Sequence, residues 1–201
     1  MSPVSHLEIG KVLPRELCDV EVIDRDGLRT RLEELLRGPT LLVFLRHFGC
    51  VGCSMQVDAL VPHLGDLAEI GVHTVLVGNG EPEHIAAFVA RHRIEDRPVT
   101  IVTEPSLAAY RAAGFERSLA ATIGPRALWN ELTAIARGYF PRRHEGDGLQ
   151  QGGALLVDDA RRLVYLARSP AATVPVSVPE LVDAAFKLAL ENLRASAEAV
   201  A

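Results

Sequence analysis

One stretch constrains the fold of this chain more than any other: an apolar run that leads into two closely spaced cysteines. The run covers residues 41–45, and the cysteines are Cys50 and Cys53. A short continuous apolar run of this kind predicts a buried strand. After Cys53, apolar residues recur at helical spacing as far as Leu67, which predicts a helix. The C-x-x-C is therefore expected where a strand ends and a helix begins.

This position predicts a chemical role for the cysteines. A helix N-terminus presents unpaired N–H groups and the positive end of the helix dipole. Both favour a thiolate, which is the reactive form of cysteine. Arg46, and His47 when protonated, add positive charge nearby. We therefore assign Cys50 and Cys53 as catalytic residues, with Arg46 and His47 as supporting residues that tune a thiol pKa or contact the substrate.

Other roles for the same residues are less well supported. Cys50, Cys53 and His47 would give a zinc ion three ligands, whereas a structural zinc site usually takes four. Three cysteines also fall short of the four that hold an iron–sulfur cluster. The pair could instead be small buried hydrophobic residues. We predict no bound metal or cofactor, and we treat Cys18 as a passive core or strand residue.

Composition narrows the class of partner. The chain has 201 residues, of which 48% are hydrophobic, and a net charge of −5. This length suits one domain, and an acidic balance argues against a nucleic-acid partner. No apolar stretch approaches the length of a membrane span, and residues 1–10 lack the pattern of a secretory signal. We expect a cytoplasmic protein without a membrane partner or structural disulfides.

The remaining patterns predict strands that alternate with helices. The predicted strands cover residues 18–23, 41–45, 72–77, 99–102, 154–158 and 163–167, and the predicted helices cover 28–36, 53–70, 81–91, 106–113, 125–140 and 177–194. Pro62 should kink its helix, and Ser177 with Glu180 forms the pattern of a capping box. Alternation predicts parallel strands with helices on both faces, and the last two strands add an antiparallel hairpin. A C-x-x-C in this setting is typical of a thioredoxin-like redox motif.

A family resemblance goes further than the motif. The stretch Phe44-Leu45-Arg46-His47-Phe48-Gly49-Cys50-Val51-Gly52-Cys53 resembles the active-site stretch of the peroxiredoxin-like proteins of the AhpC/TSA antioxidant-enzyme superfamily, the group that includes prostamide/prostaglandin F synthase. Residues 15–40 resemble the opening strand, turn and helix of that family. Residues 123–126 resemble the start of its helical insertion, and residues 146–153 its glycine-rich approach to the hairpin.

The resemblance implies a thioredoxin-like α/β fold in a single domain of residues 1–201. A central mixed sheet would have helices on both faces, with a helical insertion at about residues 119–145 before the C-terminal hairpin and helix. It also implies a thiol-dependent oxidoreductase that reduces a disulfide, a peroxide or a related electrophile through a Cys50–Cys53 dithiol/disulfide cycle. A thioredoxin- or glutathione-type thiol would regenerate the enzyme. A homodimer is left open.

The chain departs from true peroxiredoxins at one pattern. They carry P-x-x-x-T-x-x-C, which, placed on Cys53, would require proline at Arg46 and threonine at Cys50. The departure predicts slow peroxide reduction and better disulfide reduction. It also leaves two assignments open, because a peroxiredoxin alignment makes Cys53 the attacking thiol, whereas a thioredoxin-type one makes it Cys50. We favour Cys50, which we expect to be nearer the helix N-terminus and more exposed.

Residues outside the motif complete the predicted site. Gln151, which with Gln150 precedes the first hairpin strand, is assigned a supporting role in presenting the substrate. Trp129 and Tyr139 lie in the predicted insertion, where they could line a ligand pocket. An alternative hypothesis follows from such a pocket. With buried cysteines, the chain would be a non-catalytic ligand-binding protein, or a specialised protein of small-molecule biosynthesis, on a thioredoxin-like scaffold.

Overall fold

A computed structural model describes residues 7–115, 136, 138–139, 145–169 and 174–199 of the chain. Within these residues, seven strands form one mixed sheet in the order β2-β1-β5-β4-β3-β6-β7. Most of the predicted helical insertion, including Trp129, lies outside the described residues. That insertion and the assignment of one domain stay predictions.

The strands combine a parallel centre with two antiparallel hairpins. They are β1 Glu21–Ile23, β2 Arg29–Arg31, β3 Thr40–Phe44, β4 His73–Gly78, β5 Val99–Thr103, β6 Gly153–Val157 and β7 Leu163–Arg168. Strands β3, β4 and β5 are parallel, whereas β6 pairs antiparallel with both β3 and β7. The predicted alternation of strands and helices is therefore confirmed, as is the C-terminal hairpin.

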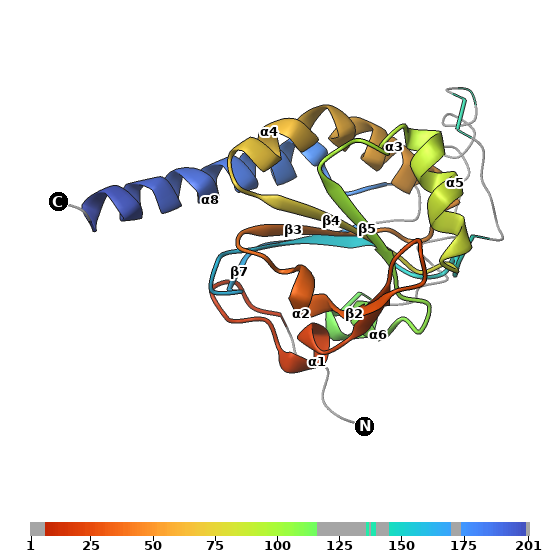
Figure 1. Ribbon diagram of the computed structural model, residues 1–201, viewed down its shortest axis with the longest axis horizontal. Helices are drawn as coiled ribbons and strands as arrows, with labels where there is room; N and C mark the ends of the chain where they lie inside the picture. Colours follow the sequence, from red (N-terminus) through yellow and green to blue (C-terminus); the bar gives the residue numbers. More distant parts are fainter. Residues whose placement is uncertain (1–6, 116–135, 137, 140–144, 170–173, 200–201) are drawn as a thin grey trace.

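Helices cover both faces of this sheet. They are α1 Arg15–Cys18, α2 Leu32–Leu35, α3 Val51–Leu60, η1 Val61–His63, α4 Leu64–Glu69, α5 Glu83–His92, α6 Ala108–Ala112 and α8 Val178–Glu198. Helices α3, α4, α5 and α8 lie on one face, and α1, α2 and α6 lie on the other (Figure 1). Each face has its own hydrophobic core.

Strand β3 joins the two cores. Its side chains alternate, so that Leu41 and Val43 belong to the core under α3, while Leu42 and Phe44 belong to the core under α1 and α6. Because both faces of β3 are covered, its five residues are all buried, and no polar alternation is seen in the sequence. This apolar run thus becomes an inner strand of the sheet, between β4 and β6.

The helix that follows the cysteines breaks where proline predicts. Helix α3 gives way at residues 61–63 to a short 3₁₀ turn that contains Pro62, and α4 continues beyond it. Proline has no N–H for the helical ladder and clashes with the preceding turn, which is the physical reason for the break. Gly71, with φ of +79°, follows the last turn and leads into β4.

Two predictions near the N-terminus were wrong. Cys18 is the last residue of α1 and not the start of a strand. Residues 29–31 form β2 and pair with β1, whereas the sequence predicted a helix from Leu28. The Asp24 carboxylate accepts the N–H groups of Asp26 and Leu28, each at 2.9 Å, and this turn folds the segment into a hairpin. Leu28 is left 67% exposed at the turn.

The C-terminal helix also differs from its prediction. Ser177 precedes α8 as expected, but its side chain makes no capping hydrogen bond. The Glu180 carboxylate, which a capping box would turn back to Ser177, instead accepts the hydroxyl of Tyr165 at 3.3 Å. The helix extends to Glu198, beyond its predicted end at residue 194.

Gly78, the last residue of β4, packs against the ring of Phe48, which lies in the segment before the cysteines. A Cβ atom there would overlap the ring of Phe48. We expect Gly78→Ala to lower the free energy of unfolding by about 1–3 kcal/mol, because the buried ring must move. Gly65→Ala is the matched control, since a Cβ in α4 meets nothing within 4 Å. It should be neutral or stabilising by up to about 1 kcal/mol. Equal urea midpoints for the two variants would contradict this account.

Candidate active site

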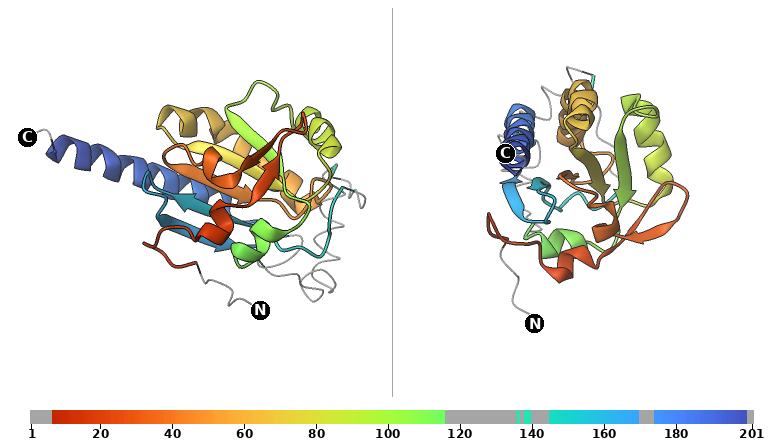
Figure 2. Two further views of the ribbon diagram at one scale, coloured as in Figure 1. Left: turned by 60° about the horizontal axis from the view of Figure 1, so that its bottom comes forward. Right: turned by 60° about the vertical axis from the view of Figure 1, so that its left-hand side comes forward.

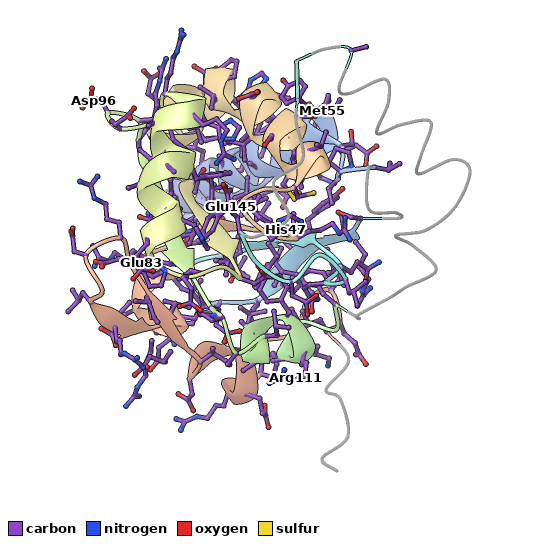
Figure 3. All side chains as sticks on the ribbon, turned by 90° about the vertical axis from the view of Figure 1, so that its right-hand side faces the viewer. His47, Met55, Glu83, Asp96, Arg111 and Glu145 are labelled. Carbon is purple, nitrogen blue, oxygen red and sulfur yellow. The ribbon has the colours of Figure 1, made fainter. Side chains whose placement is uncertain are left out.

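The two cysteines lie at the carboxyl end of β3, where α3 begins. Cys50 is the N-cap residue of α3, and Cys53 is in its first turn. The predicted position of the C-x-x-C at a strand-to-helix junction is therefore confirmed. Figure 3 looks onto this end of the sheet, with His47 and Glu145 between α3 and α5.

The two sulfur atoms have opposite acidities. The Cys53 thiol donates a hydrogen bond to the Cys50 sulfur, and this is the main reason why the pKa of Cys50 is lowered. The positive charge of Arg46 and the N–H groups of Cys53 and Gly52 lower it further, against the effect of burial. The same hydrogen bond, burial and the charge on Cys50 raise the pKa of Cys53 well above its ordinary value. Cys50 is thus the thiolate of the pair.

Exposure does not distinguish the two thiols. Cys50 and Cys53 are each 5% exposed, so the prediction that Cys50 is the more exposed one was wrong. Both side chains belong to the core under α3. Position along the helix separates them instead: Cys50 meets the N–H groups of the first turn, whereas the Cys53 sulfur accepts the backbone N–H of Arg46 at 3.1 Å.

Arg46 connects the cysteines with a distant loop. Its buried side chain donates from Nε to the carbonyl oxygen of Gln150 at 2.9 Å and from Nη2 to the carbonyl oxygen of Gly148. The guanidinium therefore fixes this loop and at the same time lowers the pKa of Cys50. The side chain of Gln151, which the sequence assigned to the site, donates instead to the Ser169 carbonyl at 2.8 Å. The neighbouring residue Gln150 contacts Arg46 through its backbone carbonyl.

His47 is a neutral side chain in this setting. Burial, followed by the charge of Arg46, lowers its pKa to about 4, although Asp147 acts in the opposite direction. Near neutral pH it therefore adds no positive charge, and Arg46 is the cation beside the thiols. His47 is 8% exposed, and its Nδ1 atom has no hydrogen-bond partner among the described residues. Tuning by a protonated His47 is thus confined to acidic pH.

Several residues that hold the site were missed in the sequence. The side chain of Asn79 donates to the Arg46 carbonyl and accepts the N–H of Asp147 at 2.9 Å. Arg91 donates to the Phe48 carbonyl at 2.9 Å and pairs with the Glu145 carboxylate at 3.0 Å. Asn79 stands between two glycines at the end of β4, a weak signal that could have marked it, whereas nothing in the pattern of α5 distinguishes Arg91.

Contacts from other parts of the chain hold the segment of residues 45–50, which carries Cys50. The Phe48 N–H donates to the carbonyl oxygen of Glu145 at 3.2 Å, so residues 48 and 145 are joined through backbone and through Arg91. The Tyr110 hydroxyl lies 2.7 Å from the Leu45 carbonyl oxygen at the base of the same segment. The position of the thiolate therefore depends on residues from α5, α6 and the loop before β6.

Comparison with known proteins identifies the family. A sequence model of the AhpC/TSA antioxidant enzyme family matches residues 59–170, more than half of the chain. The chain belongs to the AhpC/TSA antioxidant enzyme family. The matched region begins after the cysteines, so the roles of Cys50 and Cys53 in this AhpC/TSA member rest on the geometry of the site.

Named relatives agree with that family. The chain is 27% identical over 186 residues to thioredoxin-like protein AAED1, chloroplastic, from Arabidopsis thaliana, which covers 88% of this chain and 74% of the relative. It is 27% identical over 191 residues to prostamide/prostaglandin F synthase from Xenopus tropicalis, which covers 88% and 86%. The cytoplasmic location stays a prediction, since the name of the first relative places that protein in the chloroplast.

Solved structures confirm the predicted fold class. A cysteine-to-serine mutant of PrxQ from Xylella fastidiosa superposes with a TM-score of 0.64 at 15% identity, which covers 96% of this chain and 99% of the other. Peroxidoxin BcpB from Mycobacterium tuberculosis gives a TM-score of 0.63 at 15% identity, with 91% and 99% covered. The AhpC/TSA member therefore has the thioredoxin-like α/β fold of these proteins.

The described residues carry neither a cluster of metal-ligating side chains nor a membrane-spanning helix. Among them, no three His, Cys, Asp or Glu side chains gather in a way that could hold a metal ion. In the same part of the chain, no helix is both long and apolar enough to span a bilayer.

The acidities of the thiols generate the first prediction about the site. Iodoacetamide should label Cys50 first, with an apparent pKa below the ordinary thiol value of about 8.5. Arg46→Ala should slow labelling several-fold at neutral pH, because the cation that favours the thiolate is lost, and Arg46→Lys should recover part of the rate. His47→Ala should leave the rate at neutral pH unchanged, since the imidazole is already neutral. Peptide mapping against pH is the measurement, and earlier labelling of Cys53 would reverse the roles.

The contacts of Arg91 with the Phe48 carbonyl and the Glu145 carboxylate generate a second prediction. Arg91→Ala removes a hydrogen bond and leaves the Glu145 carboxylate, whose side chain is largely buried, without its ion pair. We expect a loss of about 1–3 kcal/mol in the free energy of unfolding, with faster hydrogen exchange at residues 46–50. Glu145→Gln in the Arg91→Ala background should recover part of the loss. Arg97→Ala, an exposed arginine beyond α5, is the control. An unchanged urea midpoint for Arg91→Ala would contradict the claim that these Arg91 contacts stabilise the segment that carries Cys50.

Proposed function

We propose that this protein is a peroxiredoxin-like, thiol-dependent oxidoreductase in which Cys50 attacks and Cys53 resolves. The observation that carries the proposal is the position of the two cysteines: Cys50 is the N-cap residue of α3, Cys53 lies in its first turn, and the Cys53 sulfur accepts the backbone N–H of Arg46. The lowered pKa of Cys50 and the raised pKa of Cys53 agree with these roles. This arrangement provides a nucleophilic thiolate with a second thiol in contact. Membership of the AhpC/TSA antioxidant enzyme family supports it.

The proposed cycle can begin on either of two electrophiles. With a hydroperoxide ROOH, the Cys50 thiolate attacks the terminal oxygen, the O–O bond breaks, and RO⁻ leaves as ROH after taking a proton. Cys50 becomes a sulfenic acid. With a disulfide RSSR, the thiolate attacks one sulfur, the S–S bond breaks, and RS⁻ leaves a mixed disulfide on Cys50.

The second half of the cycle is common to both. The Cys53 sulfur attacks the Cys50 sulfur, which releases water from the sulfenic acid or RS⁻ from the mixed disulfide, and a Cys50–Cys53 disulfide results. Two equivalents of an external thiol, of the thioredoxin or glutathione type, reduce this disulfide and are themselves oxidised. The chemistry uses no bound cofactor.

The electrophile that we favour is a disulfide. The Arg46 guanidinium donates to the carbonyl oxygens of Gly148 and Gln150, and these donors are then not directed at a peroxide oxygen. Cys50 itself stands where the peroxiredoxin pattern would have its threonine. Both features support slow peroxide reduction. The names of the solved structures with this fold, PrxQ and peroxidoxin BcpB, keep peroxides as the second substrate class.

Two observations favour a second candidate function. Both cysteines are buried, which the ligand-binding hypothesis requires, and a relative is named prostamide/prostaglandin F synthase. A protein of small-molecule biosynthesis would take a small apolar electrophile into such a site. Trp129 lies outside the described residues, and the Tyr139 hydroxyl donates to the Asp58 carboxylate at 2.8 Å. The two functions differ in the electrophile, which is a disulfide or a hydroperoxide in the first and a small apolar molecule in the second.

Variants of the two cysteines test the cycle. In a glutathione redox buffer, the native protein should form a reversible Cys50–Cys53 disulfide. Cys50→Ser should abolish turnover, and Cys53→Ser should allow the first attack but accumulate a mixed disulfide or a sulfenic acid on Cys50. Cys18→Ser is the control and should leave turnover unchanged, because Cys18 lies in the opposite core. Mass spectrometry of trapped thiols is the measurement. Free thiols under oxidising buffer, or stoichiometric zinc, would falsify the proposal.

Rates of oxidation test the preferred electrophile. We expect stopped-flow oxidation of the reduced protein by hydrogen peroxide to be far slower than the about 10⁸ M⁻¹s⁻¹ of a diffusion-limited enzyme. Oxidation by a disulfide should be the faster reaction at equal concentration. A peroxide rate that approaches the diffusion limit would overturn the preference for disulfides and leave the thiol cycle in place.

A further inference from the structure

The last helix carries an apolar stripe that the described part of the chain does not cover. The first half of α8 packs on the sheet through residues such as Leu181 and Ala185. Further along, Phe186, Leu190 and Leu193 are 42%, 48% and 68% exposed. Figures 1 and 2 show the second half of α8 extending beyond the rest of the molecule.

The three exposed residues form one continuous surface. They are spaced by four and three residues, so they lie on one side of the helix. This side differs from the one that carries the buried residues of α8. Among the described residues, the other large hydrophobic side chains that are exposed lie near the N-terminus, away from α8: Ile9, Val12 and Leu28. A grouped apolar surface of this kind is typical of an interaction site, whereas single exposed residues are common.

Charged residues flank this stripe in a self-complementary order. Asp183, Lys187, Glu191 and Arg194 follow one another at spacings of four, four and three, on the side of α8 next to the stripe. All four are exposed, and none forms an ion pair within the described residues. The order is acidic, basic, acidic, basic. Reversed, it is basic, acidic, basic, acidic, so an antiparallel copy of the helix places unlike charges opposite each other.

We propose that the α8 stripe is the interface of a homodimer in which two copies of this helix pack antiparallel about a two-fold axis. Phe186 would lie opposite Leu193 of the partner subunit, with Leu190 near the axis. In this register Asp183 comes within about 3 Å along the helix axis of the level of Arg194 of the partner subunit. Lys187 comes within one residue of the level of Glu191 of the partner subunit. Long side chains bridge such offsets, and the two-fold axis repeats each pair.

The charges specify both the partner and its direction. In a parallel pair, the two-fold axis would run along the helices and place the two rows of charges on opposite sides of the interface, so these four residues would form no ion pairs with their copies. The proposed interface covers about three helical turns. An interface of this length buries less area than the about 1,200 Å² of a standard stable interface. The dimer is therefore reversible, with a dissociation constant of about 1–100 µM.

Sedimentation of the reduced full-length protein over about 1–500 µM tests this interface. A thiol reductant excludes disulfide-linked dimers. We expect the weight-average mass to rise from monomer towards dimer with concentration. Leu190→Glu should weaken the association by at least about tenfold, because it buries a charge in the interface. Leu28→Glu is the matched control, since it changes an equally apolar exposed residue elsewhere, and it should leave the association unchanged.

A charge exchange tests the antiparallel direction. Asp183→Arg and Arg194→Asp should each weaken the dimer several-fold, and the double variant should restore it, because the pairs form again with opposite polarity. Circular dichroism checks that α8 stays helical in each variant. Monomer at every concentration, a dimer indifferent to Leu190→Glu, or a double variant no better than the single ones would overturn the proposal.

Discussion

The burial of β3 on both faces is the constraint on which the rest of the structure depends. Its neighbours β4 and β6 satisfy its backbone hydrogen bonds, and its alternating side chains enter two separate cores. Such a strand cannot shift by one residue, because every side chain would exchange one core for the other. Its carboxyl end, and therefore the point at which Cys50 and α3 follow, is fixed in space by packing that has no direct part in chemistry.

The sequence predicted those elements whose burial leaves a pattern. Strands β3, β4, β5 and β6 are apolar runs, and the break at Pro62 follows from proline chemistry alone. Strand β2 was missed because Arg29, Thr30 and Arg31 carry no apolar signal; its pairing with β1 depends on the turn before it. In α1, a single helical turn buries Cys18 just as a strand would, so burial could not distinguish the two.

Only the residues of the candidate site that lie close together in the sequence could be predicted from it. The spacing of Cys50 and Cys53 and the adjacent Arg46 are visible in the chain. The contacts that hold them are long-range: Arg46 binds a carbonyl 104 residues away, and Arg91 binds one 43 residues away. Most of these acceptors are backbone carbonyl oxygens, which every residue has, so no side-chain pattern marks them. The acidity order of the thiols likewise depends on three-dimensional geometry.

The hydrogen bond between the two sulfur atoms has a consequence for electron flow. It exists only in the dithiol form, where one sulfur carries a proton and the other a negative charge. Oxidation to a disulfide removes both the donor and the charge that Arg46 and the first turn of α3 stabilise. Whatever stabilises the reduced form raises the reduction potential of the couple. In the proposed cycle, the disulfide of this protein would accept electrons from external thiols more readily than an unperturbed pair of cysteines does.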